Sequence, residues 1–341
     1  MSRIAVIGAG AWGTGLAIVL GRSGNHEVRL WAHEKEVRDS ISTRHVNELF
    51  LPAQLIPTPV SPTGSLQEAL DGAEIVVSVM PSQHCRSLFQ HMLPHLKPAM
   101  LFVSATKGLE EASLLRMTEV ASQVIASGRS FTPRIGALSG PSFAKEVARG
   151  DPTAVSVASK DPELAETVQR EFSDPRFRIY TNDDVVGVEL GGALKNIIAI
   201  AAGVCDGLGL GHNSIAALIT RGLAEITRLA VACGGRQETM AGLAGLGDLV
   251  LTCTGGLSRN RSVGVALGRG RKLPEIIAGM KGAVAEGVFT TQAAVGLARA
   301  RGVEMPITEQ MDAILHRAKP PAEAMHDLMT RSVKSERASG F

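Results

Sequence analysis

The chain has few of the residues that would indicate a disulfide framework, a zinc site or a surface for polyanions. Its 341 residues include four cysteines, and none of them has Cys-x-x-Cys spacing. Scattered cysteines of this kind are typical of reduced thiols in a cytosolic enzyme. Aromatic residues make up 4% of the chain and the net charge is only +2, which argues against a nucleic-acid partner. We therefore expect a cytoplasmic protein that acts on a small molecule.

A charge-free run near the N-terminus imitates a membrane span. Residues 4–21, "IAVIGAGAWGTGLAIVLG", have the length of a transmembrane helix. However, glycines interrupt the run at positions 8, 10 and 13, and it lacks the cleavage region of a signal peptide. We predict a strand, a turn and a helix here, and no integral membrane segment.

The order of the apolar patterns predicts two domains. Short β-branched runs alternate with amphipathic stretches (83–95, 112–126 and 162–172) up to about residue 182; the runs are "RIAVIG", "HEVRLWA", "EIVVSVM", "AMLFVSAT", "RIGALSG", "TAVSVAS" and "FRIYTN". Apolar helical patterns follow, and "MAGLAGLGDLVLTCTGGLSRNRS" looks like a loop-rich interruption. We predict an α/β fold in which residues 1–188 form an N-terminal Rossmann-type doubly wound sheet and residues 189–341 a C-terminal all-α domain.

The glycines of "GAGAWG" predict a dinucleotide site. In this motif Gly8 permits a tight turn after the first strand, Gly10 lets the backbone approach a pyrophosphate, and Gly13 allows close packing of helix on strand. The N-terminus of the following helix would face the phosphates. An ordinary glycine-rich turn is the alternative for the motif taken alone.

The end of the second predicted strand leaves the choice between NAD and NADP open. An acidic residue here usually holds the adenosine ribose, and "RLWAHEKEVR" offers His33 and Glu34. Three basic residues also lie nearby, namely Arg29, Lys35 and Arg38. Glu34 favours NAD and the basic residues favour NADP, although Lys35 and Arg38 equally fit a solvated helix surface.

Polar residues follow three strands whose carboxyl ends should meet at one edge of the sheet. The residues that follow are "PSQH", "KGLE", which begins with Lys107, and "PSFAKE". The stretch "SGPSFAKE" also places Ser139, Gly140 and Ser142 around the start of a helix. Ligands of parallel α/β sheets bind beyond this edge, so these residues are expected to line the site and to suit an anion. A helix cap is the alternative role for Ser142.

One lysine lies in a segment that is otherwise almost wholly apolar. Between residues 185 and 205 the only charged residues are Glu189 and Lys195, and about 240° of helix rotation separates them. A helix that is apolar nearly all round is expected to be buried, and burial lowers the pKa of an amine toward neutrality. An amine with such a pKa suits proton transfer. The alternative for Lys195 is a side chain that extends from a packed helix to solvent and has no catalytic role.

The segment after this helix supplies a carboxylate and a group of donors. Asp248 lies alone between apolar runs, and a cluster of four donors follows two glycines, namely Ser258, Arg259, Asn260 and Arg261. The donors suit a phosphate, while Asp248 could also be a helix cap. Three histidines (84, 91 and 95) could share a helix side, but no carboxylate joins them, so we expect no metal site.

Together these motifs resemble the NAD(P)-dependent glycerol-3-phosphate dehydrogenase family, in particular its bacterial soluble members. The motifs occur in the family's order over nearly the whole chain: "GAGAWGT", "ATKGLE", "SGPSFAKEV", "LGGALKNIIAIAAG", "ALITRGLAE", "GLAGLGDLVLTCT", "SRNR" and "VEMPIT". The resemblance implies reduction of dihydroxyacetone phosphate to sn-glycerol 3-phosphate by NADH or NADPH, for phospholipid synthesis, in a protein that is frequently a homodimer.

The resemblance also implies roles for individual residues. Lys195 would be the proton donor and acceptor, with Asp248 supporting it. The substrate would be bound by those two residues together with Lys107, Gly140, Ser142, Ser258, Arg259 and Asn260. The cofactor would be bound by Gly8, Gly10, Ala11, Trp12, Gly13, His33, Lys107, Ala144, Arg259, Val284 and Glu286.

Two other functions remain open from the residues. A hydroxy-acid or ketopantoate-type reductase would join the same two kinds of domain, and its carboxylate substrate would need a similar anion clamp. A dinucleotide-sensing module without turnover would use Lys195 for packing only.

Overall fold

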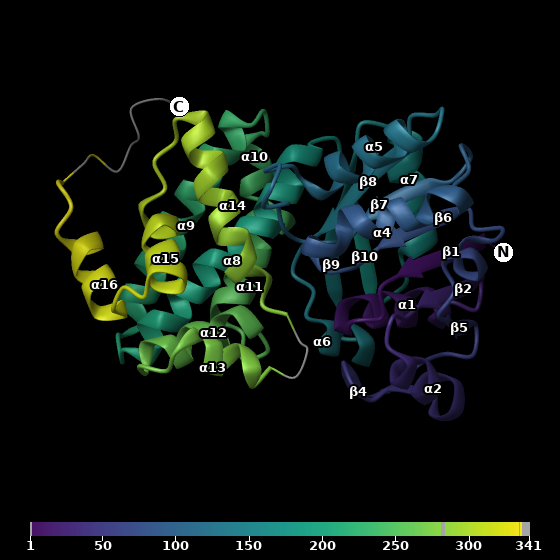
Figure 1. Ribbon diagram of the computed structural model, residues 1–341, viewed down its shortest axis with the longest axis horizontal. Helices are drawn as coiled ribbons and strands as arrows, with labels where there is room; N and C mark the ends of the chain where they lie inside the picture. Colours follow the sequence, from purple (N-terminus) through teal and green to yellow (C-terminus); the bar gives the residue numbers. More distant parts are fainter. Residues whose placement is uncertain (1, 281–283, 334, 336–341) are drawn as a thin grey trace.

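The computed structural model describes residues 2–280, 284–333 and 335, and it has two parts. The first part holds a sheet with helices on both faces, and the second consists of packed helices (Figure 1). The predicted fold class is confirmed. The predicted boundary between residues 188 and 189 falls inside helix α8 (Val185–Gly207), which follows the last strand, and the division into domains stays a prediction.

The main sheet has eight strands in the order β10-β9-β8-β7-β6-β1-β2-β5. All neighbours are parallel except β8 and β9. The strands are β1 (Ser2–Ile7), β2 (His26–Trp31), β5 (Val60–Thr63), β6 (Ile75–Ser78), β7 (Leu101–Ser104), β8 (Arg134–Ser139), β9 (Thr153–Ser159) and β10 (Phe177–Asn182). Every predicted strand is present. Strand β5 and the pair of β3 (Val46–Asn47) and β4 (Leu51–Leu55) were not predicted from the sequence.

Helices bury apolar side chains against both faces of this sheet, as a doubly wound fold requires. One face is covered by α1 (Ala11–Arg22), α2 (Lys35–Arg44) and α7 (Pro162–Phe172), and the other by α3 (Leu66–Leu70), α4 (Cys85–Met92) and α5 (Met117–Gly128). Three further helical segments complete this part, namely η1 (Ser82–His84), η2 (Leu93–His95) and α6 (Ala144–Arg149). The predicted helix at 162–172 is confirmed.

The predicted helix at 112–126 begins later in the structure than expected. Its first residues instead form a loop, in which Leu114 adopts a left-handed conformation (φ +61°) and Leu109 pairs with Arg116 through an isolated antiparallel bridge. The cap that starts α5 comes only at Arg116, whose backbone N–H donates to the Glu119 carboxylate at 3.0 Å. Apolar periodicity alone does not reveal such a cap.

Helix α8 is the centre of the second part. Around it lie α9 (His212–Ala232), α10 (Gln237–Met240), the π-helix η3 (Leu243–Gly247), α11 (Asp248–Thr254), α12 (Arg259–Gly268), α13 (Leu273–Ala278), α14 (Glu286–Arg301), α15 (Pro306–Arg317) and α16 (Pro321–Met329). Helix α8 is long and apolar enough to cross a membrane, but 89% of its apolar window is buried inside the protein. Residues 4–21 divide into β1 and α1, as predicted.

The segment expected to be loop-rich is mostly helical, so that prediction was wrong. Its glycines looked like helix breakers, yet one of them, together with a glycine of α8, allows close contact between backbones. A Cβ atom at Gly245 would lie 2.2 Å from the carbonyl oxygen of Met240, and a Cβ at Gly191 would lie 2.6 Å from that of Ala244. Single-sequence patterns do not distinguish a glycine that ends a helix from one that admits a neighbour.

Glycines also set the distance between α8 and α12, the two helices that carry Lys195 and Arg259. A Cβ atom at Gly264 would lie 2.0 Å from the carbonyl oxygen of Ile200, and one at Gly203 would lie 2.1 Å from that of Arg261. Real Cβ atoms do not approach a backbone oxygen this closely, so the helices touch through their main chains.

We predict that Gly264→Ala destabilises the protein by about 1–3 kcal/mol, because the added methyl group must push α12 away from α8. Chemical denaturation measures this change. Gly211→Ala is the matched control, because a Cβ there meets no atom within 4 Å and φ is −77°. Equal stability of the two variants would contradict the close packing.

Candidate active site

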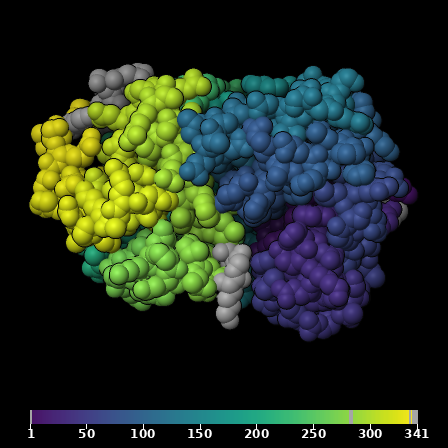
Figure 2. Space-filling model, viewed as in Figure 1, coloured from purple at the N-terminus to yellow at the C-terminus, as the bar shows by residue number. Residues whose placement is uncertain are grey.

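The site residues lie in a cleft between the carboxyl edge of the sheet and the helical part. Figure 2 shows the surface hollowed where the purple N-terminal segment faces the green segment that includes α12 and α13. On the sheet side, Gly8, Lys107 and Gly140 follow the ends of β1, β7 and β8. On the helical side, α8, α11 and α12 contribute Lys195, Asp248 and a donor cluster.

The turn between β1 and α1 has the geometry that a dinucleotide needs. Gly8 has φ +120°, and a Cβ there would lie 2.6 Å from the carbonyl oxygen of Val79. A Cβ at Gly13 would collide with the oxygen of Gly8, whereas the space beside Gly10 is open to 4 Å. No side chain caps the start of α1, and the first intrahelical bond is donated by the Thr14 N–H, so the N–H groups of Ala11, Trp12 and Gly13 are free for a phosphate.

Trp12, in the same turn, provides a second observation that fits a bound group. Its indole Nε1 is buried and has no hydrogen-bond partner among the described residues. A buried donor of this kind usually finds a partner, and a cofactor or a water molecule could supply it. The residues present therefore fit a dinucleotide.

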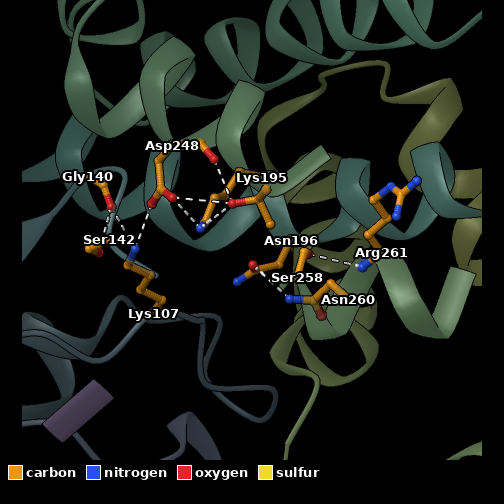
Figure 3. Close-up of polar contacts among 10 residues, drawn as sticks. Lys107, Gly140, Ser142, Lys195, Asn196, Asp248, Ser258, Asn260 and Arg261 are labelled. Atoms are coloured by element: carbon orange, nitrogen blue, oxygen red, sulfur yellow. Dashed lines mark hydrogen bonds and ion pairs between the residues drawn. The ribbon is translucent and has the colours of Figure 1, made fainter. Parts of the chain in front are cut away.

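Lys195 is withdrawn from water in the middle of α8, with 6% of its surface exposed. Its ammonium donates to Oδ1 of Asp248 and, at 2.7 Å, to Oγ1 of Thr252 (Figure 3). The pKa of Lys195 is lowered to about 8, mainly by burial. The Asp248 carboxylate raises this pKa, and the positive charge of Lys107 lowers it further. The amine can therefore hold or release a proton near neutral pH.

The Asp248 carboxylate joins two lysines that come from different parts of the chain. It lies at the first position of α11 and is only 1% exposed. Its Oδ2 accepts a hydrogen bond of 2.6 Å from Lys107, while its Oδ1 accepts from Lys195 (Figure 3). One carboxylate between two ammonium groups leaves a net positive charge at the cleft, which attracts an anionic ligand.

Gly140 and Ser142 lie beside Lys107, where the sequence placed them. The Lys107 ammonium donates to the carbonyl oxygen of Gly140 at 3.1 Å, and the Ser142 hydroxyl donates to the same oxygen at 2.9 Å. Gly140 has φ +144°, and a Cβ there would lie 2.9 Å from Cα of Val155. This strand end therefore requires a glycine. The helix that follows is capped at Phe143, so Ser142 is not its N-cap.

A second polar cluster lies at the start of α12. Oγ of Ser258 accepts the N–H of Arg261 at 3.2 Å and so caps the helix. The Asn260 amide donates to Oδ1 of Asn196 at 2.9 Å and accepts the N–H of Gly287 at 3.0 Å. In Figure 3 this cluster lies beside the Lys195 group, and the Arg261 guanidinium turns away from it. The prediction that Arg261 belongs to the donor cluster was wrong, because its guanidinium pairs with Asp206 at the end of α8.

Arg259 and Glu286 interact through their charges on the helical side of the cleft. Arg259 is exposed, and the Glu286 carboxylate attracts its charge. Glu286 also accepts hydrogen bonds from Ser82, at 2.6 Å from the hydroxyl and 3.3 Å from the N–H. This contact joins the start of α14 to the loop after β6. Val284 is half-buried just before α14.

The remaining predicted cofactor residues lie around the same edge of the sheet. His33 is exposed just after β2, and Glu34 caps α2 without a side-chain bond. Of the basic residues near His33, Arg29 pairs with Glu27 and Glu68, and Lys35 with Asp39. Arg38 donates to the carbonyl oxygens of residues 32 and 33. Ala144 begins α6, and its oxygen lies 3.4 Å from a Cβ built at Gly15 of α1.

Two side chains of this site, Thr252 and Asn196, were not predicted, and Ser82 was expected at the edge of the sheet without a partner. Thr252 follows Asp248 by four residues and holds the Lys195 amine, a spacing that places both on one face of α11. Asn196 is next to Lys195 and anchors Asn260. Ser82 holds Glu286 across a sequence separation of 204 residues, and no local pattern could have shown this contact.

The fold and the cleft define a two-part protein of the Rossmann type, with a dinucleotide turn on one side and a buried lysine–aspartate–lysine group on the other. The family models for the N-terminus and the C-terminus of NAD-dependent glycerol-3-phosphate dehydrogenase match residues 3–165 and 184–326. The chain belongs to this family.

Curated and solved relatives agree with this assignment. The glycerol-3-phosphate dehydrogenase [NAD(P)+] of Koribacter versatilis is 70% identical over 336 residues, which cover 98% of this chain and 99% of that protein. The crystal structure of the Coxiella burnetii glycerol-3-phosphate dehydrogenase has a TM-score of 0.91 at 41% identity and covers 97% of this chain and 99% of that one. A ketopantoate reductase from Ralstonia eutropha has a TM-score of 0.60 at 17% identity, with coverage of 95% and 100%, and shares the fold alone.

We predict that Asp248→Asn destabilises the protein by about 3–5 kcal/mol at neutral pH, because it leaves the buried Lys195 ammonium and the half-buried Lys107 ammonium without their carboxylate. The same change lowers the pKa of Lys195 below 8, since Asp248 raises it. The folded variant then releases its proton at a lower pH than the folded parent. The deficit is therefore largest in mildly acidic solution and shrinks as the pH rises to about 8.

Chemical denaturation across this pH range checks the result. Asp151→Asn is the control, since Asp151 forms an exposed pair with Arg149. A deficit that does not vary with pH would contradict the coupling of Asp248 to a titrating amine.

Proposed function

We propose that this protein interconverts dihydroxyacetone phosphate and sn-glycerol 3-phosphate by hydride transfer with NADH or NADPH. The observation that carries the proposal is the buried Lys195 amine, held by Asp248 at the cleft that the glycine turn faces. Family membership and the high identity to the Koribacter versatilis enzyme support it.

The cofactor would supply or accept the hydride when bound. Its pyrophosphate would lie on the free N–H groups at Gly10, Ala11, Trp12 and Gly13. The other residues proposed to line its site are Gly8, His33, Lys107, Ala144, Arg259, Val284 and Glu286. Both acidic and basic side chains follow β2, so we propose NAD or NADP without a preference between them.

Lys195 would act as the proton donor and acceptor. When the substrate carbonyl is reduced, the ammonium delivers a proton to the carbonyl oxygen, and in the reverse direction the amine removes the hydroxyl proton. A pKa of about 8 leaves both forms of Lys195 accessible near neutral pH. Asp248 would orient the amine and balance its charge, because each of its oxygens holds one lysine.

The donors on both sides of the cleft would hold the triose phosphate. Arg259 is exposed to an incoming phosphate, and Asn260 is fixed by contacts to Asn196 and Gly287. We propose that they bind the phosphate together with Ser258, which still has a hydroxyl hydrogen to donate while it caps α12. Lys107, Gly140 and Ser142 would contact the substrate from the sheet side.

Further properties are proposed from the family resemblance and the chain's composition. We propose that the protein works in the cytoplasm as a homodimer and reduces its substrate toward phospholipid precursors. We also propose that the sheet domain comprises residues 1–188 and that residues 189–341 form the domain that carries Lys195.

The direct test is the oxidation of NADH and NADPH, followed by absorbance, on addition of dihydroxyacetone phosphate. Ketopantoate and a simple 2-keto acid serve as comparison substrates. We expect oxidation of the cofactor only with the triose phosphate, because the cleft carries a net positive charge and several hydrogen-bond donors suited to a phosphate. Preferred turnover of a keto acid would replace this function by that of a carboxylate reductase.

We predict that Lys195→Ala abolishes turnover and leaves cofactor affinity nearly unchanged, because the amine lies on the helical side of the cleft, opposite the glycine turn. Steady-state kinetics and cofactor titration by fluorescence measure the two effects. Lys160→Ala serves as the control, since Lys160 is exposed after β9. Unchanged turnover in Lys195→Ala would favour a role in packing only, as in a sensing module.

A further inference from the structure

The loop that begins at Lys107 belongs to the sheet part by sequence but packs against the helical part through two leucines. Leu109 is only 3% exposed and lies in the same apolar core as Leu190 and Leu194 of α8. Leu114, at the far side of the loop, packs against this core as well, and a Cβ built at Gly296 of α14 would lie 3.1 Å from Cδ2 of Leu114. The packing of the helices therefore determines where this loop lies.

The end of the loop is held by a buried carboxylate of α8. Glu189 is 8% exposed and accepts hydrogen bonds from the Thr118 N–H at 2.9 Å and the Thr118 hydroxyl at 2.6 Å. The Arg116 guanidinium forms an ion pair with the same carboxylate. Arg116 also binds Glu119 at 2.7 Å, so its side chain is fixed from two sides.

The two ends of the loop are tied to each other. Leu109 forms a backbone bridge with Arg116, and the N–H of Glu110 donates to the oxygen of Leu115 at 3.0 Å. The Arg86 guanidinium donates to both carboxylate oxygens of Glu110, at 2.9 and 2.7 Å. A displacement of Arg116 is therefore passed to Leu109, which is two residues from Lys107.

We propose that Glu189 is a positioning residue that holds the Lys107 ammonium against Asp248. Glu189 and Lys195 project from the same helix, about 9 Å apart along its axis at about 1.5 Å per residue. One rigid helix thus carries the reactive amine directly and places the second amine through Arg116 and the loop. Neither Glu189 nor Arg116 touches the reacting atoms in this scheme.

The charges around Lys195 give the proposal a specific readout. Asp248, Lys107 and Cys253 are the charged or titratable groups that act on its amine. Burial is the largest cause of its lowered pKa, and the positive charge of Lys107 lowers it further. If Lys107 moves away, the pKa of Lys195 rises, so the pH profile of turnover shifts to higher pH.

The test compares Glu189→Gln with the matched control Glu225→Gln. Glu225 is likewise buried (2% exposed) on a helix, and it accepts the N–H groups of Ile307 and Thr308 at the start of α15. Both variants lose a buried helical carboxylate, and both are expected to lose stability. Only Glu189→Gln should displace Lys107, whose side chain is 17% exposed in the parent.

Two measurements follow displacement of Lys107. Acetylation of each lysine by acetic anhydride, read by peptide mass spectrometry, should accelerate at Lys107 in Glu189→Gln and not in Glu225→Gln. Turnover of Glu189→Gln should fall roughly tenfold to hundredfold, as expected for a displacement on the order of 1 Å, with its pH profile shifted upward. The turnover measurement rests on the proposed function, whereas the labelling measurement stands without it.

A double-mutant cycle gives the sharpest result. If Glu189 acts through Lys107, Glu189→Gln should reduce turnover in the parent and have almost no additional effect in a Lys107→Ala background. Additive losses in the cycle, or equal labelling of Lys107 in the parent and Glu189→Gln, would overturn the proposal. If the parent is inactive but Lys107 is labelled faster in Glu189→Gln than in the parent, the proposed function is rejected and the positioning role of Glu189 is supported.

Discussion

The structure depends on one buried carboxylate shared between two amines. Asp248 is nearly inaccessible to water, and its two oxygens bind lysines that reach it from a strand end and from the central helix. Burying such charges is costly unless each is paired and hydrogen-bonded, and here the Thr252 hydroxyl supplies a further bond. The two halves of the molecule must therefore come together with small tolerance.

Close packing of the helices holds the three charged groups in position within this small tolerance. Helix α8 contacts α12 through glycine backbones. The π-helix η3, which ends directly before Asp248, approaches α8 at Gly191. Asp248 is the first residue of α11, so this packing fixes the position of its carboxylate beside Lys195. The loop from Lys107 enters the same helical core through Leu109, so all three charged groups are positioned by one packed unit.

Local patterns in the sequence predicted much of the fold and part of the site. The glycine turn, the predicted strands and the helix at 162–172 follow from rules that act over a few residues. The burial of Lys195 could be predicted because its neighbours are apolar all round. In contrast, Lys107 meets Asp248 across 141 residues, and the residues alone gave no distance between them. The family resemblance assigned both residues to the substrate site, but it did not predict the contact between them.

The errors have physical causes of the same kind. Glycines between residues 240 and 262 looked like loop residues, because a glycine inside a helical turn cannot be told locally from one that ends a helix; Gly245 lies within the π-helix η3, against the Met240 backbone. Helix α5 was predicted to start too early because its cap is a tertiary arrangement of Arg116, Glu119 and Glu189. Strand β5 carries a proline and lies at the edge of the sheet, where the apolar pattern is weak.

The most direct measurement of the central claim is the titration of the Lys195 amine by NMR, with lysine labelled at the side chain and the signal assigned through Lys195→Arg. The account predicts a midpoint near pH 8, well below that of an exposed lysine. A midpoint near the ordinary value of 10.5 would show that the amine is hydrated and would contradict the account.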